Sequence, residues 1–172
     1  MRYEAIDPLA RASEILERME NGGVLGVVTD NAGRVNALTL GWGMLGRGYH
    51  GHPICTIAIT PLRYSWQLIE EVPEFVLAVP DDSPQLRAAV DLCGSASGRG
   101  YDKLAAAKLT PIPSRHVRPP SILEFPINVE CRVYTKIAPP HMLLTPEHRE
   151  RPLADQHTIY FAEVLGAYRW RE

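Results

Sequence analysis

The chain has 172 residues, a length that fits one compact domain able to bury a sizeable core. Hydrophobic residues make up 45% and charged residues 22%, with a formal net charge of −2, which excludes a disordered chain and disfavours a general binder of nucleic acid or anionic membranes. Cys55, Cys93 and Cys131 form an odd set without close pairs, so a disulfide framework is not expected. The first residues lack an apolar signal-peptide stretch, and no apolar run approaches the ~20 residues that span a bilayer. We therefore expect a cytoplasmic protein.

The first predicted element is a short helix over about residues 8–21. Asp7 suits the N-cap and Pro8 the first helical position, and the glycines at 22–23 end the helix. One apolar stripe at helical spacing supports it: Leu9, Ala12, Ile15, Leu16 and Met19.

Strands dominate the rest of the chain. They are predicted at residues 24–30, 35–40, 54–59, 74–79, 127–137 and 157–168, with a hairpin turn at 31–33. Residues 127–137 alternate apolar and polar side chains, a pattern typical of an antiparallel strand with one exposed face.

Short helices are predicted at residues 65–71, 83–92 and 102–109, and the proline-rich stretch 111–126 is predicted to be an extended surface connection. Helices and strands do not alternate strictly, which disfavours a doubly wound parallel sheet. The sequence therefore predicts a mainly β protein, a closed or nearly closed antiparallel barrel with peripheral helices. We expect one domain over residues 1–172, with the barrel over about 23–168.

The segment from Ile59 to Ser65 joins a strand to a helix. Ser65 can serve as the N-cap, and the free amide groups of a helix N-terminus attract an anion. Arg63 stands just before that end and can add a charge-assisted bond to a phosphate. Two interpretations stay open: a phosphate cradle, or an ordinary cap beside a solvated arginine.

The segment from Cys93 to Lys103 is rich in small residues, which let a backbone approach a ligand closely. Ser97, Arg99 and Lys103 supply donors for an anion, and Asp102 can cap the following helix. The alternative is a flexible surface loop. The segment has neither the dinucleotide fingerprint nor the Walker pattern.

The segment 35–43 carries an amide and a large aromatic ring. Asn36 and Trp42 are an even number of positions apart, so a regular strand places them on one face, which suits a planar heteroaromatic ligand. Thr39 would point the other way unless a bulge intervenes. The alternative is an ordinary strand that ends in a packed tryptophan.

A metal site is a further alternative, because His50 and His52 lie near Cys55. Zinc sites usually need four ligands at defined spacing, and the histidines at 141, 148 and 157 are remote in the chain. We predict no metal site.

Taken in order, these segments resemble the flavin reductase-like family of FMN-binding split barrels, from about Gly23 to Gly166. The resemblance rests on an ordered set of motifs: Asn36-x-x-Thr39-x-x-Trp42, Thr60 to Ser65, Glu74-Phe75-Val76, Cys93-Gly94 to Ser97-Gly98-Arg99, Asp102-Lys103-Leu104, Glu130-Cys131, and His157-Thr158-Ile159 to Glu163-Val164.

The resemblance implies a Greek-key split β-barrel, usually a homodimer with FMN near the interface. It implies these cofactor-binding residues: Arg63, Tyr64 and Ser65 at the phosphate; Asn36, Thr39 and Trp42 along the isoalloxazine or ribityl part; Ser97, Gly98, Arg99, Asp102 and Lys103 closing the site. His157 matches a histidine that faces the flavin or nicotinamide side, and it is the catalytic candidate. Gln156 departs from the Gly-Asp that often precedes this histidine, and Ser65 stands where the family often has threonine.

The implied activity is that of an NAD(P)H-dependent flavin reductase, in which NADH or NADPH gives hydride to the flavin. The alternative is an FMN-containing electron carrier without steady-state turnover. A monooxygenase or another redox protein is the implied partner. No ribose-recognition motif distinguishes NADH from NADPH.

Overall fold

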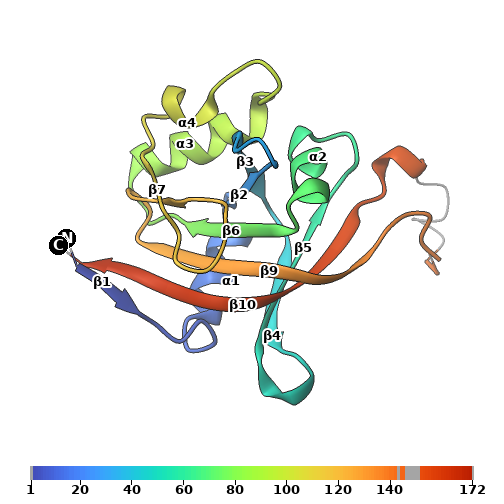
Figure 1. The fold of residues 1–172 in the computed structure, drawn as a ribbon, viewed down its shortest axis with the longest axis horizontal. Helices are drawn as coiled ribbons and strands as arrows, with labels where there is room; N and C mark the ends of the chain where they lie inside the picture. The colour runs from blue at the N-terminus through green and yellow to red at the C-terminus, as the bar shows by residue number, and fades with distance from the viewer. Residues whose placement is uncertain (1, 143, 146–151, 172) are drawn as a thin grey trace.

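The computed structural model describes residues 2–142, 144–145 and 152–171 (Figure 1). Its strands are β1 (Arg2–Ala5), β2 (Val24–Thr29), β3 (Val35–Leu40), β4 (Gly43–Arg47), β5 (Pro53–Ile59), β6 (Glu74–Val79), β7 (Pro111–Ile112), β8 (Ser121–Ile122), β9 (Ile127–Ile137) and β10 (Thr158–Arg171). Its helices are α1 (Ala12–Glu20), α2 (Tyr64–Glu71), α3 (Pro84–Ser95) and α4 (Lys103–Ala106), with 3₁₀ turns η1 (Tyr49–Gly51) and η2 (Leu153–Asp155).

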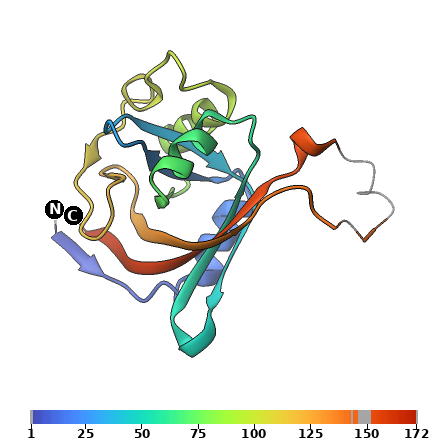
Figure 2. The ribbon, with the colours of Figure 1, turned by 45° about the vertical axis from the view of Figure 1, so that its right-hand side comes forward.

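Eight strands form one antiparallel sheet in the order β3-β2-β6-β9-β10-β5-β4, with β1 paired to β10. The sheet curls into a barrel, as Figures 1 and 2 show. β3 and β4 follow each other in the chain but lie at opposite ends of the strand order, so the barrel is split between them. This confirms the predicted mainly β split barrel.

Two hydrophobic cores stabilise this arrangement. The larger core fills the barrel, where Ile15 and Met19 of α1 pack with strand residues such as Ile57 and Leu77. The second core lies between the outer side of the sheet and the helices α3 and α4. It is made of Leu25, Val27, Ala37, Val76, Ala78, Leu86, Ala89, Val90, Cys93, Leu104, Leu109, Ile122 and Phe125. The second core holds α3 against β3, where the candidate site lies.

The first helix starts later than predicted. Asp7 accepts a hydrogen bond from the amide of Leu9 at 2.9 Å, which makes a local turn. α1 begins at Ala12, with Arg11 at the N-cap. The predicted N-cap role of Asp7 is therefore wrong, because its carboxylate is used in the turn before the helix.

The prediction of a half-exposed strand at 127–137 is wrong for its first half. Residues 127–131 are all buried, and exposure begins at Arg132. Asn128 exchanges hydrogen bonds with the backbone of Ile122 at 2.8 and 3.0 Å. Glu130 accepts hydrogen bonds from the backbone amides of Arg115 and His116, in the segment that crosses β9. Both polar side chains are buried because this segment covers the outer face of β9.

The covering segment is the proline-rich stretch 111–126, which was predicted to run over the surface. It forms the short pair β7–β8, and it places Ile122 and Phe125 in the second core with exposures of 0%. Its apolar residues are too sparse to predict this packing, which depends on the sheet beneath them.

β1 and β4 were not predicted. β4 contains two glycines in five residues and pairs only with β5, so its sequence lacks the apolar alternation of a strand. The cysteines are free and buried, in agreement with the expected absence of a disulfide framework. In the described ranges, no helix combines the length and apolar character that crossing a membrane requires.

Candidate functional site

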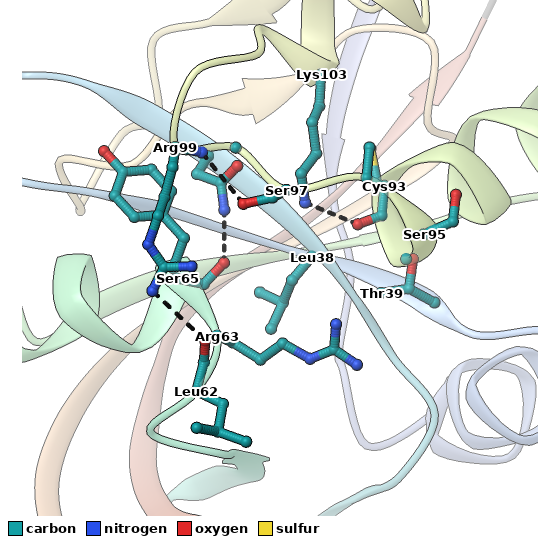
Figure 3. Close-up of a pocket in the computed structure, with 15 residues that line it drawn as sticks. Leu38, Thr39, Leu62, Arg63, Ser65, Cys93, Ser95, Ser97, Arg99 and Lys103 are labelled. Carbon is teal, nitrogen blue, oxygen red and sulfur yellow. Dashed lines mark hydrogen bonds between the residues drawn. The ribbon is translucent and has the colours of Figure 1, made fainter.

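A cavity of about 160 Å³ lies between β3, the start of α2 and the segment from the end of α3 to α4 (Figure 3). It brings together nine of the predicted site residues: Asn36, Thr39, Arg63, Tyr64, Ser65, Ser97, Gly98, Arg99 and Lys103. β3 is the terminal strand of the sheet, so its free edge is available to the cavity. This explains why Asn36 and Thr39 both line it, although alternation predicted opposite directions for their side chains.

The floor of the cavity joins three chain segments. Asn36 Nδ2 donates a hydrogen bond to Ser65 Oγ at 2.7 Å, and both side chains are buried. A Cβ atom on Gly98 would overlap with Oδ1 of Asn36, so only glycine lets the backbone of this loop approach β3 so closely. The loop therefore approaches β3 closely, whereas its small residues predict a close approach to a ligand, which stays a prediction.

The N-cap of α2 is Arg63, and the prediction of Ser65 as the cap is wrong. Ser65 lies within the first turn, where its hydroxyl accepts the bond from Asn36. The first amide groups of a helix have no partner within it and attract anions. The guanidinium of Arg63 forms no ion pair with a described carboxylate, and it reaches from α2 past Leu38 in Figure 3.

Arg99 crosses from the loop to the start of α2. Its Nη2 atom lies 3.5 Å from the carbonyl oxygen of Leu62, and its guanidinium lies 5.7 Å from the centre of the Tyr64 ring. Its own amide lies 3.4 Å from the hydroxyl of Ser97. Arg99 therefore connects the two walls of the cavity.

Lys103 is buried, with 6% of its surface exposed. Its ammonium donates to the carbonyl oxygens of Ala37 and Cys93, each at 2.8 Å, and so joins β3 to α3. Burial lowers the pKa of Lys103, and the nearby charge of Arg63 lowers it further. Burial likewise raises the pKa of the Cys93 thiol, which keeps that thiol protonated and unreactive.

All the charged side chains that line the cavity are positive. Arg63, Arg99 and Lys103 line it, and no carboxylate of the described residues does. Three cations close together repel one another, and a bound anion relieves that repulsion. The cavity is therefore suited to a phosphate.

A second cavity of about 120 Å³ adjoins the first and shares Leu38, Thr39 and Arg63 with it. Trp42 and His157 also line it, with their ring centres 5.7 Å apart and their ring planes inclined by 66°. The aromatic side chains thus lie beyond the cationic end, and the two cavities form one cleft along β3.

Asp102 is the one predicted site residue that lies outside this cleft. It caps α4 by accepting a hydrogen bond from the amide of Ala105 at 3.0 Å, as its predicted capping role requires. It lines a separate surface cavity with Val35 and Leu104. Its side chain is therefore used at the helix end.

Cys93 and Gly94 line the cleft but were not among the predicted site residues. The sequence predicts a loop from Cys93 onward, whereas α3 continues to Ser95. The apolar spacing of Leu86, Ala89, Val90 and Cys93 was the signal for this longer helix.

The metal alternative gains no support from the described residues, where no group of three potential ligands comes together. Cys55 is 1% exposed inside the barrel core. The side chain of His50 and the whole of His148 lie outside the described parts.

A family model described as the flavin reductase like domain matches residues 17–171. The chain belongs to the flavin reductase-like family. Curated relatives of this flavin reductase-like chain include an uncharacterized protein of Pyrococcus abyssi, 33% identical over 67% of the chain, and one of Archaeoglobus fulgidus, 33% identical over 63%. The chain spans about half the length of these relatives, 56% and 52%.

Solved structures share the fold at low identity. Flavoredoxin of Desulfovibrio vulgaris matches with a TM-score of 0.68 at 23% identity, over 87% of this chain and 69% of its own. Component B of nitrilotriacetate monooxygenase from Bacillus cereus matches with a TM-score of 0.67 at 16% identity, over 98% and 82%. An NADH:FAD oxidoreductase of Streptomyces globisporus matches with a TM-score of 0.61 at 19% identity, over 97% and 87%.

The residues of the cleft fit the flavin mononucleotide that the family binds. A cationic end without carboxylates suits a phosphate, and Gly98 lets the loop pack against Asn36 to close one side of that end. The aromatic end with Trp42 suits a planar ring system.

Proposed function

We propose that this flavin reductase-like protein binds FMN along the β3 cleft and catalyses its reduction by NADH or NADPH. The observation that carries the proposal is the polarity of the cleft: Arg63, Arg99 and Lys103 line the first cavity with no described carboxylate, Trp42 and His157 line the second, and Arg63 lies between the two.

In this proposal the phosphate lies against the start of α2. Arg63 supplies a charge-assisted bond, and the amides of Tyr64 and Ser65 face the anion at the positive end of the helix dipole. Asn36 and Thr39 line the path from there toward Trp42.

FMN, when bound, supplies the chemistry, because its N5 atom accepts a hydride from a nicotinamide. The protein orients the two molecules. His157 lies at the aromatic end of the cleft, where it can orient the donor or move a proton.

Arg63→Ala tests the phosphate assignment. Loss of one charge-assisted bond is worth about 1.5–3 kcal/mol, so FMN affinity should fall by tenfold or more. Arg11→Ala is the matched control, because Arg11 pairs with Glu14 on α1 and lines neither cavity. Unchanged FMN affinity in Arg63→Ala would exclude the assignment.

His157→Ala tests the catalytic assignment. The rate of flavin reduction by NADH or NADPH under anaerobic conditions should fall by more than FMN affinity falls. Equal reduction rates in the variant and the wild type would remove His157 from the mechanism.

An FMN-containing electron carrier is a second candidate, favoured by the structural similarity to a flavoredoxin. Steady-state oxidation of NADH or NADPH with excess free FMN separates the two. A reductase turns over, and a carrier keeps its FMN and does not.

The proposal includes a homodimer. Beyond the end of β9 the chain leaves the barrel as an arm (Figure 2), and three apolar side chains at its base and on its described part are exposed: Tyr134 by 59%, Ile137 by 50% and Met142 by 88%. Exposed apolar side chains gathered on one projection are typical of a protein interface. Light scattering of the purified protein tests the dimer.

A monooxygenase component that consumes reduced flavin is the proposed partner class, as the similarity to a monooxygenase component B supports.

A further inference from the structure

Arg99 lies at the cationic end of the cleft, between the α3–α4 loop and the start of α2. Its guanidinium spans from the α3–α4 loop to the Leu62 carbonyl oxygen at 3.5 Å and covers the Tyr64 ring at 5.7 Å. Figure 3 shows Arg99 and Arg63 on different sides of this end, with Leu62 beneath them. Arg99 therefore closes the rim that the loop and the start of α2 form together.

The base of the same end is also closed. The backbone of Gly98 lies so close to Asn36 that a Cβ atom there would overlap with the Asn36 amide. Asn36 in turn is bonded to Ser65 at 2.7 Å. A chain of atoms continuing past the phosphate position would meet Gly98 and Asn36 at the base and Arg99 at the rim.

The two common flavins differ at this point. FMN ends in a monophosphate, which offers a guanidinium three terminal oxygens and close to two negative charges on one phosphorus. FAD carries a diphosphate there, with one charge on each phosphate, and continues into an adenosine group. Arg99 therefore favours binding of the FMN monophosphate and obstructs the adenosine group of FAD.

We propose that Arg99 makes the site selective for flavin mononucleotide over FAD. The inference rests on the proposed function, because it places the flavin phosphate at the cationic end of the cleft. It adds the residue that determines which flavin is bound.

The test measures dissociation constants of riboflavin, FMN and FAD from the quenching of flavin fluorescence, without any electron donor. The proteins compared are the wild type, Arg99→Ala and the control Arg11→Ala. We expect the wild type and Arg11→Ala to bind FMN at least about tenfold more tightly than FAD, a difference of about 1.4 kcal/mol. In Arg99→Ala, FMN should bind more weakly and FAD at least as tightly as before, so that the preference falls to about threefold or less.

Arg99 is exposed in a loop, and its replacement leaves both cores intact. Equal affinity of the wild type for FMN and FAD overturns the inference and leaves the proposed function standing. An Arg99→Ala variant that loses affinity for both flavins by the same factor also overturns it. If the wild type binds none of the three flavins, the proposed function itself fails.

Discussion

The side-chain amide of Asn36 donates a hydrogen bond of 2.7 Å to the hydroxyl of Ser65, and this contact joins the edge strand β3 to the first turn of α2. Asn36 is 3% exposed and Ser65 is 1% exposed, so loss of one partner leaves the other largely without a replacement for its hydrogen bond. The contact fixes the helix end that faces the cationic cavity against the strand that forms its floor.

Ser65→Ala should lower the free energy of unfolding by about 1–3 kcal/mol, because the buried Asn36 amide loses its acceptor. FMN affinity should fall as well, since the start of α2 is held less firmly. Ser13→Ala, at an exposed position of α1, should change stability by less than about 0.5 kcal/mol. Urea unfolding and FMN titration of both variants check this. Identical unfolding curves for Ser65→Ala and Ser13→Ala would contradict it.

Gly98 and Gly100 provide a matched pair of glycines in one loop. A Cβ atom at Gly98 would overlap with Asn36, whereas a Cβ atom at Gly100 meets nothing within 4 Å. Gly98→Ala should push the loop away from β3 and weaken FMN binding by about tenfold, the effect of a ~1.4 kcal/mol loss. Gly100→Ala should leave FMN affinity unchanged. The prediction fails if the two variants bind FMN equally well.

Lys103 contributes to the fold as well as to the charge of the cavity. Lys103→Met keeps the length of the side chain but leaves the carbonyl oxygens of Ala37 and Cys93 without their donor. The variant should lose about 2–4 kcal/mol of stability, since each unpaired buried group costs about 1–3 kcal/mol and removal of a buried charge offsets part of the loss. Lys108→Met alters an exposed lysine and should have little effect. Equal midpoints in urea would exclude a structural role for Lys103.

Much of the barrel could be predicted because its strands carry local signals. The predicted bounds of β3, β6 and β9 agree with the structure, since apolar β-branched runs ended by turn residues mark them. β4 carries no such signal, because its glycines gain their strand conformation only by pairing with β5. The burial of both faces of β9 depends on residues 111–126, which a period-2 pattern cannot reveal.

The candidate site, like the barrel, could be predicted only in part. Residue types indicated which segments would bind an anion, and the structure gathers nine of those residues around one cavity. The contacts that shape the cavity could not be predicted from the sequence, because they join distant residues. Asn36 and Ser65 are 29 positions apart, and Lys103 bonds to the carbonyl oxygen of Ala37, 66 positions away. Such contacts exist only once β3 has become an edge strand beside α2 and α3.

Alkaline pH should destabilise the protein through a contact at the end of α2 that lies away from the cleft. Tyr160 is 1% exposed in the barrel core, and its hydroxyl donates a hydrogen bond of 2.7 Å to Glu70. Burial raises the pKa of Tyr160, and the hydrogen bond to Glu70 and the charge of Glu70 raise it further. The folded protein therefore keeps this proton at a pH where the unfolded chain, with a tyrosine pKa near ~10, releases it. Stability from this group is complete below pH ~10 and is lost above it, by up to about 1.4 kcal/mol per pH unit.

Tyr160→Phe should be less stable than the wild type at pH 8 by about 1 kcal/mol, because one hydrogen bond is lost. Its stability should then fall less steeply between about pH 10 and 11, because one proton fewer is released on unfolding. Some slope should remain, since burial also raises the pKa of Tyr3 and Tyr168. Tyr101→Phe, at a side chain that is 47% exposed, should keep the wild-type slope. Urea unfolding of the three proteins at several pH values measures these slopes. Parallel curves for Tyr160→Phe and the wild type would mean that the bond to Glu70 does not retain the Tyr160 proton.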